Sequence, residues 1–292
     1  MNTSTGILRE DKESTFPSYS AVLFVVDGLR PDGIEESSTP QIDGLMKNGA
    51  HTFKARTVMP SITLPCIASM FLGTEPEHHG ITTNTWVPMA RRIPSVIDII
   101  HSAGKTCASF YNWEPLRDLS IPGSLDAAVF RRNCDAPQGD REIADAAAQY
   151  LSNNNVSFVF VYLGYTDAAG HAHGWMSETY LEAVENADAA IEKVIDTLKN
   201  KGRLEDTFLI VTSDHGGHEN THGTDLPEDL IVPWIISGPG IPSGLTLEDD
   251  VHIIDTAPTV AALLEVEIPK QWTGRVISGL VQPARNMPTV NR

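Results

Sequence analysis

The stretch AVLFVVDG (residues 21–28) is an apolar run that ends in an aspartate and a glycine. The pattern occurs twice more along the chain: SFVFVYLGYT (157–166) runs into Asp167, and FLIVTS (208–213) runs into Asp214 and His215. Short apolar runs bounded by turn residues are typical of buried strands. In an open α/β sheet, ligands bind in the crevice beyond the carboxyl ends of the strands. We therefore expect the three carboxylates to converge on one site.

Strand and helix patterns alternate along the whole chain. Strands are expected at residues 21–26, 52–58, 106–110, 157–163, 207–213 and 232–237, and helices at 40–48, 66–72, 93–103, 140–153, 178–200 and 252–264. Such alternation predicts an α/β fold in which a mostly parallel central sheet is covered by helices on both faces.

Length and composition favour one large domain. The chain has 292 residues with 41% hydrophobic content, which is enough to bury a substantial core. We expect a flexible N-terminal tail at residues 1–18 and a single domain at 19–292. Residues 85–141 are expected to form a small insertion that selects the substrate, with Trp86 and Trp113 as candidates for stacking on it.

Seven residues are of the types that hold two divalent metal ions with a hydroxyl between them: Asp27, Thr63, Asp167, His171, Asp214, His215 and His222. Taken alone, Asp27 followed by Gly28 would be an ordinary turn. The segment that begins with Asp214 and His215 is harder to explain as a turn, because a turn has no use for the adjacent imidazole. The seven residues together therefore favour metal binding.

The spacing and chemistry of these residues support the same interpretation. Asp167 and His171 stand four positions apart, so a helical turn would place both on one face. Packed carboxylates would repel one another without cations. Mixed Asp and His ligands suit zinc, with manganese or iron as alternatives, whereas an all-oxygen set would suggest magnesium or calcium.

Thr63 has two interpretations. It lies in MPSITLPC (59–66), just before a predicted helix, so it is a candidate N-cap residue. It is also a candidate nucleophile, because metal coordination lowers the pKa of a hydroxyl and a helix N-terminus favours a bound phosphoryl group. The two roles are compatible with each other.

The motifs resemble those of the alkaline phosphatase superfamily, and within it the type I phosphodiesterase/nucleotide pyrophosphatase family. The matching pieces occur in the family's order and span roughly residues 20–275: VVDGLRPD, STPQIDGLMKNG, MPSITLPC, EPEHHGITTN, TDAAGHAHG, TSDHGGH, and THG followed by PWIISGPG. Each piece is weak, but seven in order make a specific signal.

The resemblance implies roles for the individual residues. One metal ion would be held by Asp167, His171 and His222, and the second by Asp27, Thr63, Asp214 and His215. Asn84 would help to bind a non-bridging phosphate oxygen. Two departures from the family pattern stand out. Cys66 occupies a position where many members have Asn, and His218 competes with His222 as a ligand because no long insertion separates them from His215.

The implied activity is that of a two-metal phosphoryl-transfer hydrolase. It would act on phosphodiesters or nucleotide pyrophosphates through a phosphothreonine intermediate at Thr63. A phosphomonoesterase or a phosphonate hydrolase of the same superfamily is the alternative, and a metal-binding protein without turnover is the alternative from another class. A sulfatase is disfavoured, because the string Thr63-Leu-Pro-Cys-Ile67 lacks the Cys/Ser-x-Pro-x-Arg pattern of that chemistry.

Composition limits the partners. A net charge of −17, from 21 basic and 38 acidic residues, argues against a nucleic acid polymer or an anionic membrane as a partner. The resemblance implies a small phosphate ester as the substrate. The sequence has no apolar stretch of membrane-spanning length and no apolar signal region at its N-terminus. Three cysteines without disulfide or zinc spacing agree with a reducing compartment. A cytoplasmic location is therefore expected, and the oligomeric state stays open.

Overall fold

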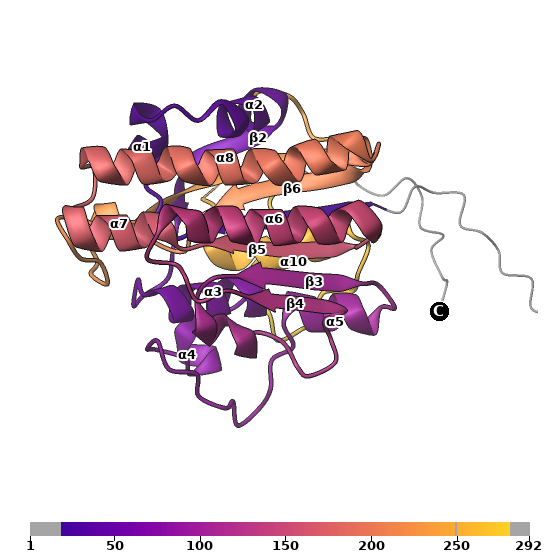
Figure 1. Ribbon diagram of the computed structural model, residues 1–292. Coiled ribbons are helices and arrows are strands. Elements are labelled where there is room, and N and C mark those ends of the chain that lie inside the picture. The colour runs from indigo at the N-terminus through magenta and orange to yellow at the C-terminus, as the bar shows by residue number, and fades with distance from the viewer. Residues whose placement is uncertain (1–18, 249, 281–292) are drawn as a thin grey trace, which may run out of the picture.

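A single sheet of eight strands organises the part of the chain that the structure describes. The computed structural model describes residues 19–248 and 250–280. The strands lie in the order β4-β3-β5-β1-β6-β7-β2-β8 (Figure 1). Their bounds are β1 Ser20–Val26, β2 Ala50–Arg56, β3 Cys107–Tyr111, β4 Ala127–Phe130, β5 Phe158–Leu163, β6 Thr207–Thr212, β7 Ile231–Ser237 and β8 Leu245–Thr246. Only β7 runs against its neighbours, so the predicted mostly parallel sheet is confirmed.

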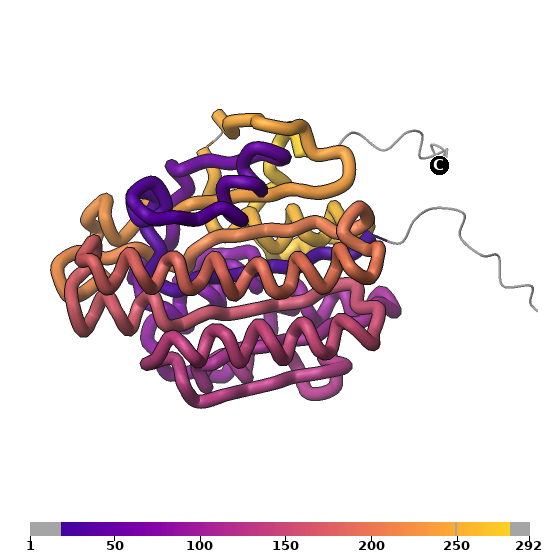
Figure 2. The backbone as a smooth tube through the Cα atoms, turned by 45° about the horizontal axis from the view of Figure 1, so that its top comes forward, coloured from indigo at the N-terminus to yellow at the C-terminus, as the bar shows by residue number. Residues whose placement is uncertain are grey.

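Helices cover both faces of the sheet, as Figures 1 and 2 show. One face carries α1 (Pro31–Glu36), α2 (Pro40–Asn48), α6 (Pro137–Asn153) and α8 (Glu178–Asn200), and the other carries α3 (Thr63–Leu72), α5 (Val96–Ser102) and α10 (Thr256–Leu263). Strand β1 contributes to both cores because its side chains alternate: Phe24 packs with the first group of helices, and Leu23 and Val25 pack with the second. The burial of both faces explains why these strands are apolar throughout.

Short elements complete the fold and carry part of the site. They are α4 (Pro76–His79), α7 (Tyr165–His173), α9 (Pro227–Leu230) and the 3₁₀ turns η1 (Glu114–Asp118), η2 (Leu204–Asp206) and η3 (Ile253–Asp255). The sequence analysis missed β4 and β8, because four and two residues are too short to show a strand period. The predicted tail at residues 1–18 lies outside the described residues. Within the described ranges, no helix is both long and apolar enough to cross a membrane.

Part of the segment 85–141 belongs to the main fold. It contributes α5, β3 and β4, and the two strands form one edge of the sheet beside β5. The part after β3 lies near the carboxyl ends of the strands, where Trp113 lines a cleft. Its role in substrate selection stays a prediction.

The three strands that carry the predicted carboxylates are neighbours at the centre of the sheet. Strand β1 pairs in parallel with β5 on one side and with β6 on the other. The main-chain N–H of Asp27, just beyond β1, donates to the carbonyl of Leu163 at the end of β5 (3.0 Å). The loops that leave these three strands therefore begin at the same edge of the sheet.

Candidate metal centre

Asp27 and Asp214 follow the adjacent strands β1 and β6 and are both buried. The main-chain N–H of Gly28 donates to Asp214 Oδ1 (3.3 Å), and the Thr57 hydroxyl donates to the Asp214 carbonyl. Gly28 has a positive φ of 68°, and a Cβ there would lie 3.2 Å from the Cα of Asp167. The turn at Gly28 and the carboxylate of Asp27 thus belong to one arrangement. Gly28 allows the loop after β1 to pass close to Asp167.

Asp167 and His171 lie on α7, which follows β5. As their spacing predicts, they share one face of the helix, with His171 Nε2 3.5 Å from Asp167 Oδ1. His222 reaches the same oxygen from the loop after β6, because its Nε2 is also 3.5 Å from Asp167 Oδ1. The two imidazoles and the carboxylate form the first group of donors.

A main-chain carbonyl fixes the tautomer of each of three histidines. The Nδ1 atoms of His171, His215 and His222 lie 2.8–2.9 Å from the carbonyl oxygens of Asn220, Gly216 and Ser61. A carbonyl oxygen only accepts, so each Nδ1 carries the proton and each Nε2 presents a lone pair. Metal-binding histidines are oriented by the same kind of contact.

His215 connects the two groups of donors. Its Nε2 lies 3.3 Å from Asp27 Oδ1 and 3.5 Å from Asp214 Oδ2. Its ring stacks on that of His222, with centroids 3.8 Å apart. Within the described ranges, ligand atoms lie within 4.8 Å of one another in two sets, one of Asp27, Asp214 and His215 and one of Asp167, His215 and His222.

The electrostatics of the site fit bound cations. Burial raises the pKa of Asp27 well above its usual value, and the charges of Asp214 and Asp167 raise it further. One oxygen of each carboxylate is buried and has no hydrogen-bond partner among the described residues: Asp27 Oδ1, Asp167 Oδ1 and Asp214 Oδ2. Burial, and next the neighbouring His215, lower the pKa of His222 to about 4, which keeps this imidazole neutral. Unpaired oxygens and neutral imidazoles are the donors that zinc, manganese or iron would bind.

Thr63 faces the second group of donors. It is the first residue of α3, and Ile62 occupies the N-cap position, so the N-cap interpretation of Thr63 is wrong. Its hydroxyl oxygen lies 3.2 Å from His215 Nε2. The helix starts earlier than predicted because Pro65 stands in its first turn, where the missing N–H removes no helical hydrogen bond.

The structure also distinguishes the roles of the remaining predicted residues, Asn84, His218 and Cys66. Asn84 Oδ1 accepts from the N–H of Leu64 (3.0 Å), which places its amide beside the start of α3. His218 Nδ1 lies 2.7 Å from Asp229 Oδ1, so His222 and not His218 stands beside Asp167. Cys66 is fully buried, and burial raises the pKa of its thiol, which therefore stays protonated.

Several residues around the site were not foreseen. The Tyr162 hydroxyl donates to Asp27 Oδ2. Trp175 Nε1 and the Tyr180 hydroxyl both donate to the Gly28 carbonyl, each at 2.9 Å. From the sequence alone, these aromatic residues would be assigned to the hydrophobic core. The one available signal was the position of Tyr162 next to the end of a strand, where a hydroxyl can reach the strand-end loops.

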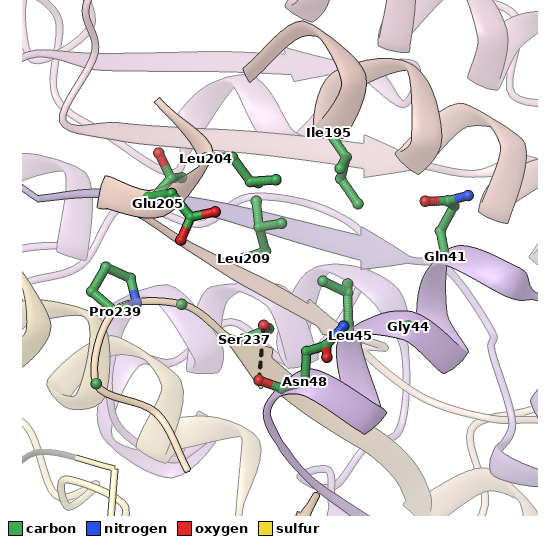
Figure 3. Close-up of a pocket in the computed structure, with 13 residues that line it drawn as sticks. Gln41, Gly44, Leu45, Asn48, Ile195, Leu204, Glu205, Leu209, Ser237 and Pro239 are labelled. Atoms are coloured by element: carbon green, nitrogen blue, oxygen red, sulfur yellow. Dashed lines mark hydrogen bonds between the residues drawn. The ribbon is translucent and has the colours of Figure 1, made fainter. Parts of the chain in front are cut away.

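The site opens into a cleft of about 510 Å³. Its lining includes part of the donors, together with Asn84, Trp113, Cys134 and Asp135, and no Lys or Arg is among the described lining residues. The donors in the lining are Asp27, Asp167, His171 and His222. Trp86 is not part of this lining; it packs against the core. A second hollow of about 500 Å³ lies where β6 begins and β7 ends (Figure 3). It is lined by residues such as Asn48, Glu205 and Ser237 and contains none of the donors.

The fold is alkaline-phosphatase-like, and a group of carboxylates and imidazoles lies at the carboxyl edge of its sheet. The chain belongs to the type I phosphodiesterase/nucleotide pyrophosphatase family, whose profile it matches over residues 21–267. The family is metal-dependent.

Relatives and solved structures agree with this assignment. The chain is 27% identical over 222 residues to ectonucleotide pyrophosphatase/phosphodiesterase family member 1 of Mus musculus, a match that covers 69% of this chain and 24% of the relative. Murine ectonucleotide pyrophosphatase/phosphodiesterase 5, solved as an inactive variant with AMP, has a TM-score of 0.73 at 16% identity, covering 86% of this chain and 96% of that one. The phosphonate monoester hydrolase of Silicibacter pomeroyi has a TM-score of 0.69 at 18% identity, with coverages of 92% and 78%. A 2-O GAG sulfatase shares the fold as well.

Proposed function

We propose that the protein is a two-metal hydrolase that cleaves phosphodiesters or nucleotide pyrophosphates through a phosphothreonine intermediate at Thr63. The observation that carries the proposal is the position of the Thr63 hydroxyl, 3.2 Å from His215 Nε2. His215 belongs to both sets of donors, so a hydroxyl at this position lies between the two. Zinc is the proposed metal, with manganese or iron as alternatives.

In the proposed mechanism, Thr63 attacks the phosphorus atom in line with the bond to the leaving group. A bond forms between its Oγ1 and phosphorus while the bond from phosphorus to the leaving oxygen breaks, and the proton lost by the Thr63 hydroxyl is balanced by protonation of the departing alcohol or phosphate. Asn84 and the N-terminus of α3 bind a non-bridging oxygen of the phosphoryl group. Water then cleaves the phosphothreonine and restores the hydroxyl. When bound, the metal ions lower the pKa of the hydroxyl and stabilise the negative charge that develops on the phosphoryl oxygens.

The lining of the cleft supports a diester as the substrate. A phosphomonoester carries about two negative charges near neutral pH, whereas a diester carries one. No Lys or Arg is among the described residues that line the cleft, and Asp135 adds a carboxyl group. A monoester dianion would therefore depend on the metals alone for neutralisation. The same reasoning favours simple diesters over nucleotide pyrophosphates, and phosphomonoesters and phosphonates remain the alternatives.

The test compares bis-p-nitrophenyl phosphate with p-nitrophenyl phosphate, using zinc- or manganese-loaded protein. We expect faster cleavage of the diester, and we expect Thr63→Ala to lower it on the order of a thousandfold or more while the bound metal is largely retained. Thr246→Ala, at an exposed position on β8, is the matched control and should be fully active. A monoester preference would assign the protein to the phosphatase alternative. Full activity of Thr63→Ala would refute the phosphothreonine.

A second variant tests the donors. Asp214→Asn should lose bound metal and activity together, because it replaces a fully buried carboxylate of the second donor set. Metal content is measured by elemental analysis of the purified protein. Normal metal occupancy in this variant would exclude Asp214 as a ligand. Metal binding without turnover of either substrate, in the unchanged protein, would favour the non-catalytic alternative. The cytoplasmic location stays a prediction.

A further inference from the structure

A buried pair of polar residues, Asn112 and Asp140, contacts the start of α7. Asn112 directly follows β3 and is 1% exposed, and Asp140 lies in the first turn of α6 and is fully buried. Asn112 Nδ2 donates to Asp140 Oδ1 at 2.9 Å. The two side chains come from different elements and are 28 positions apart, so the sequence gives no sign that they meet.

The pair binds the first two main-chain N–H groups of α7. The N–H of Gly164, the N-cap residue, donates to Asn112 Oδ1 (3.1 Å), and the N–H of Tyr165 donates to Asp140 Oδ1 (3.3 Å). The N-cap glycine has no side chain with which to satisfy these groups. The first N–H groups of a helix need partners from outside the helix, and Asn112 and Asp140 supply them.

The contact is tight and electrostatically specific. A Cβ at Gly164 would lie 2.9 Å from Asn112 Oδ1, so the close approach of the start of α7 to the pair depends on a glycine at this position. The Asp140 carboxyl lies at the N-terminal ends of both α6 and α7, where helix dipoles favour negative charge. Burial nevertheless raises its pKa to about 7, although hydrogen bonds, first from Asn112 and next from Tyr165, lower it. A hydrophobic residue would avoid this cost, which suggests that the carboxyl is retained for its position.

Helix α7, which Asn112 and Asp140 contact, carries ligands of the first donor group only. Asp167 and His171 lie on α7, one turn and two turns beyond the fixed N–H groups. Asp27 and Asp214 are carried by the loops after β1 and β6 instead. A change at the start of α7 therefore displaces one set of donors and leaves the other on its own strands.

We propose that Asn112 and Asp140 are positioning residues for a single metal ion, the one bound by Asp167, His171 and His222. They act through α7 and do not touch the ion. The inference rests on the proposed two-metal function. It also predicts an asymmetry, because disruption of the pair weakens one of the two ions and spares the other.

The experiment measures both metal dissociation constants separately in the 292-residue chain. Metal-free protein is titrated with Co²⁺, followed by visible absorption, and with Zn²⁺ in the presence of a competing chelator. In Asp140→Ala and in Asn112→Ala we expect one affinity to fall about 10- to 100-fold, as is typical when a residue supporting a ligand is lost. The other affinity should change by no more than about threefold.

Three further variants sharpen the result. Asp145→Ala removes an exposed carboxylate from the same helix α6 and should leave both affinities unchanged. Asp140→Asn keeps an oxygen that can accept both hydrogen bonds, so it should restore most of the lost affinity. Asp27→Asn should weaken the ion that the pair does not affect, which identifies the two ions. Circular dichroism and thermal melting establish that each variant is folded.

The outcomes separate this inference from the proposed function. An unchanged protein that binds fewer than two ions would overturn the two-metal function itself. Two ions in the unchanged protein, with equal loss or no loss at both ions in folded Asn112→Ala and Asp140→Ala, would overturn the positioning role alone. If Asp140→Ala does not fold, Asn112→Ala decides, and an equal loss or no loss of affinity at both ions in that variant would have the same meaning.

Discussion

At the scale of single residues, the two oxygens of Asp27 have different roles. Oδ2 accepts a hydrogen bond from the Tyr162 hydroxyl, and Oδ1 is buried without a partner beside His215. Tyr162 is itself fully buried and is held by its strand, so it fixes the rotation of the carboxylate. One oxygen is thereby reserved for a ligand.

Replacement of Tyr162 by Phe tests this role. The variant keeps the aromatic packing and removes only the hydroxyl, so the carboxylate is free to rotate. We expect metal affinity to fall about tenfold or more at the ion bound by Asp27. Isothermal titration with Zn²⁺ measures this loss. Tyr150→Phe removes a hydroxyl from the outer helix α6 and is the control; an equal loss in both variants would exclude a specific role for Tyr162.

At the scale of elements, α3 is held at both ends. Its first residue is Thr63, and its last turn contacts His79 of α4 through a 2.9 Å contact between Ser69 Oγ and His79 Nε2. The N–H of Ile81 donates to His79 Nδ1, so Nε2 carries the proton and donates to Ser69. In its neutral form, the buried imidazole of His79 thus makes a hydrogen bond through each of its two ring nitrogens. His79 therefore connects α3 with the segment that follows α4.

The neutral state of His79 predicts a pH dependence of stability. Burial lowers its pKa from 6.5 to about 4, so below pH 6.5 the unfolded chain binds a proton that the folded protein does not. The stabilisation is therefore complete above pH 6.5 and is lost as the pH falls towards 4. Between pH 7 and pH 5 the loss should be about 2 kcal/mol.

Urea unfolding in the presence of EDTA at pH 7 and pH 5 measures this effect. The difference between the two free energies of unfolding should be smaller in His79→Gln than in the unchanged protein. His101→Gln, at an exposed position in α5, should not alter it. The same pH dependence in all three proteins would show that His79 does not contribute.

At the scale of the whole molecule, the proposed function makes stability depend on the ions that the buried carboxylates would hold. Asp27 and Asp214 lie together with little exposure, and no Lys or Arg is paired with them among the ion pairs of the described residues. In the proposed function, the folded protein binds the ions at a preformed site that the unfolded chain lacks. Binding to the folded state alone stabilises it.

Removal of the metal should therefore lower the melting temperature. At a free metal concentration a thousandfold above the dissociation constant, each ion contributes about 4 kcal/mol. For a chain of this size we expect a fall on the order of 10 °C when EDTA removes one such ion. Differential scanning calorimetry with and without Zn²⁺ measures the change, and Asp214→Asn should show a smaller one. An unchanged melting temperature would contradict tight binding.

The sequence predicted what depends on local pattern. Strands β1, β5 and β6 are apolar because both their faces are buried, so their ends and the strand-end donors were visible in the chain. Asn112 and Asp140 gave no such signal, because a polar residue after a strand or in the first turn of a helix is common. Their role arises only when β3, α6 and α7 meet. Helix α7 was also difficult to delimit, since its histidines and glycine show no apolar period.

The order of the central strands has a consequence for how the protein matures. Strand β1 begins at residue 20, but its partners begin at residues 158 and 207. A nascent chain that has exposed only its first half thus carries Asp27 and Thr63 without any of the histidine donors. Pairings between such distant segments form slowly. The two donor sets are therefore complete only once these distant strands have paired, so the proposed metal ions would bind late in biogenesis and would not nucleate folding.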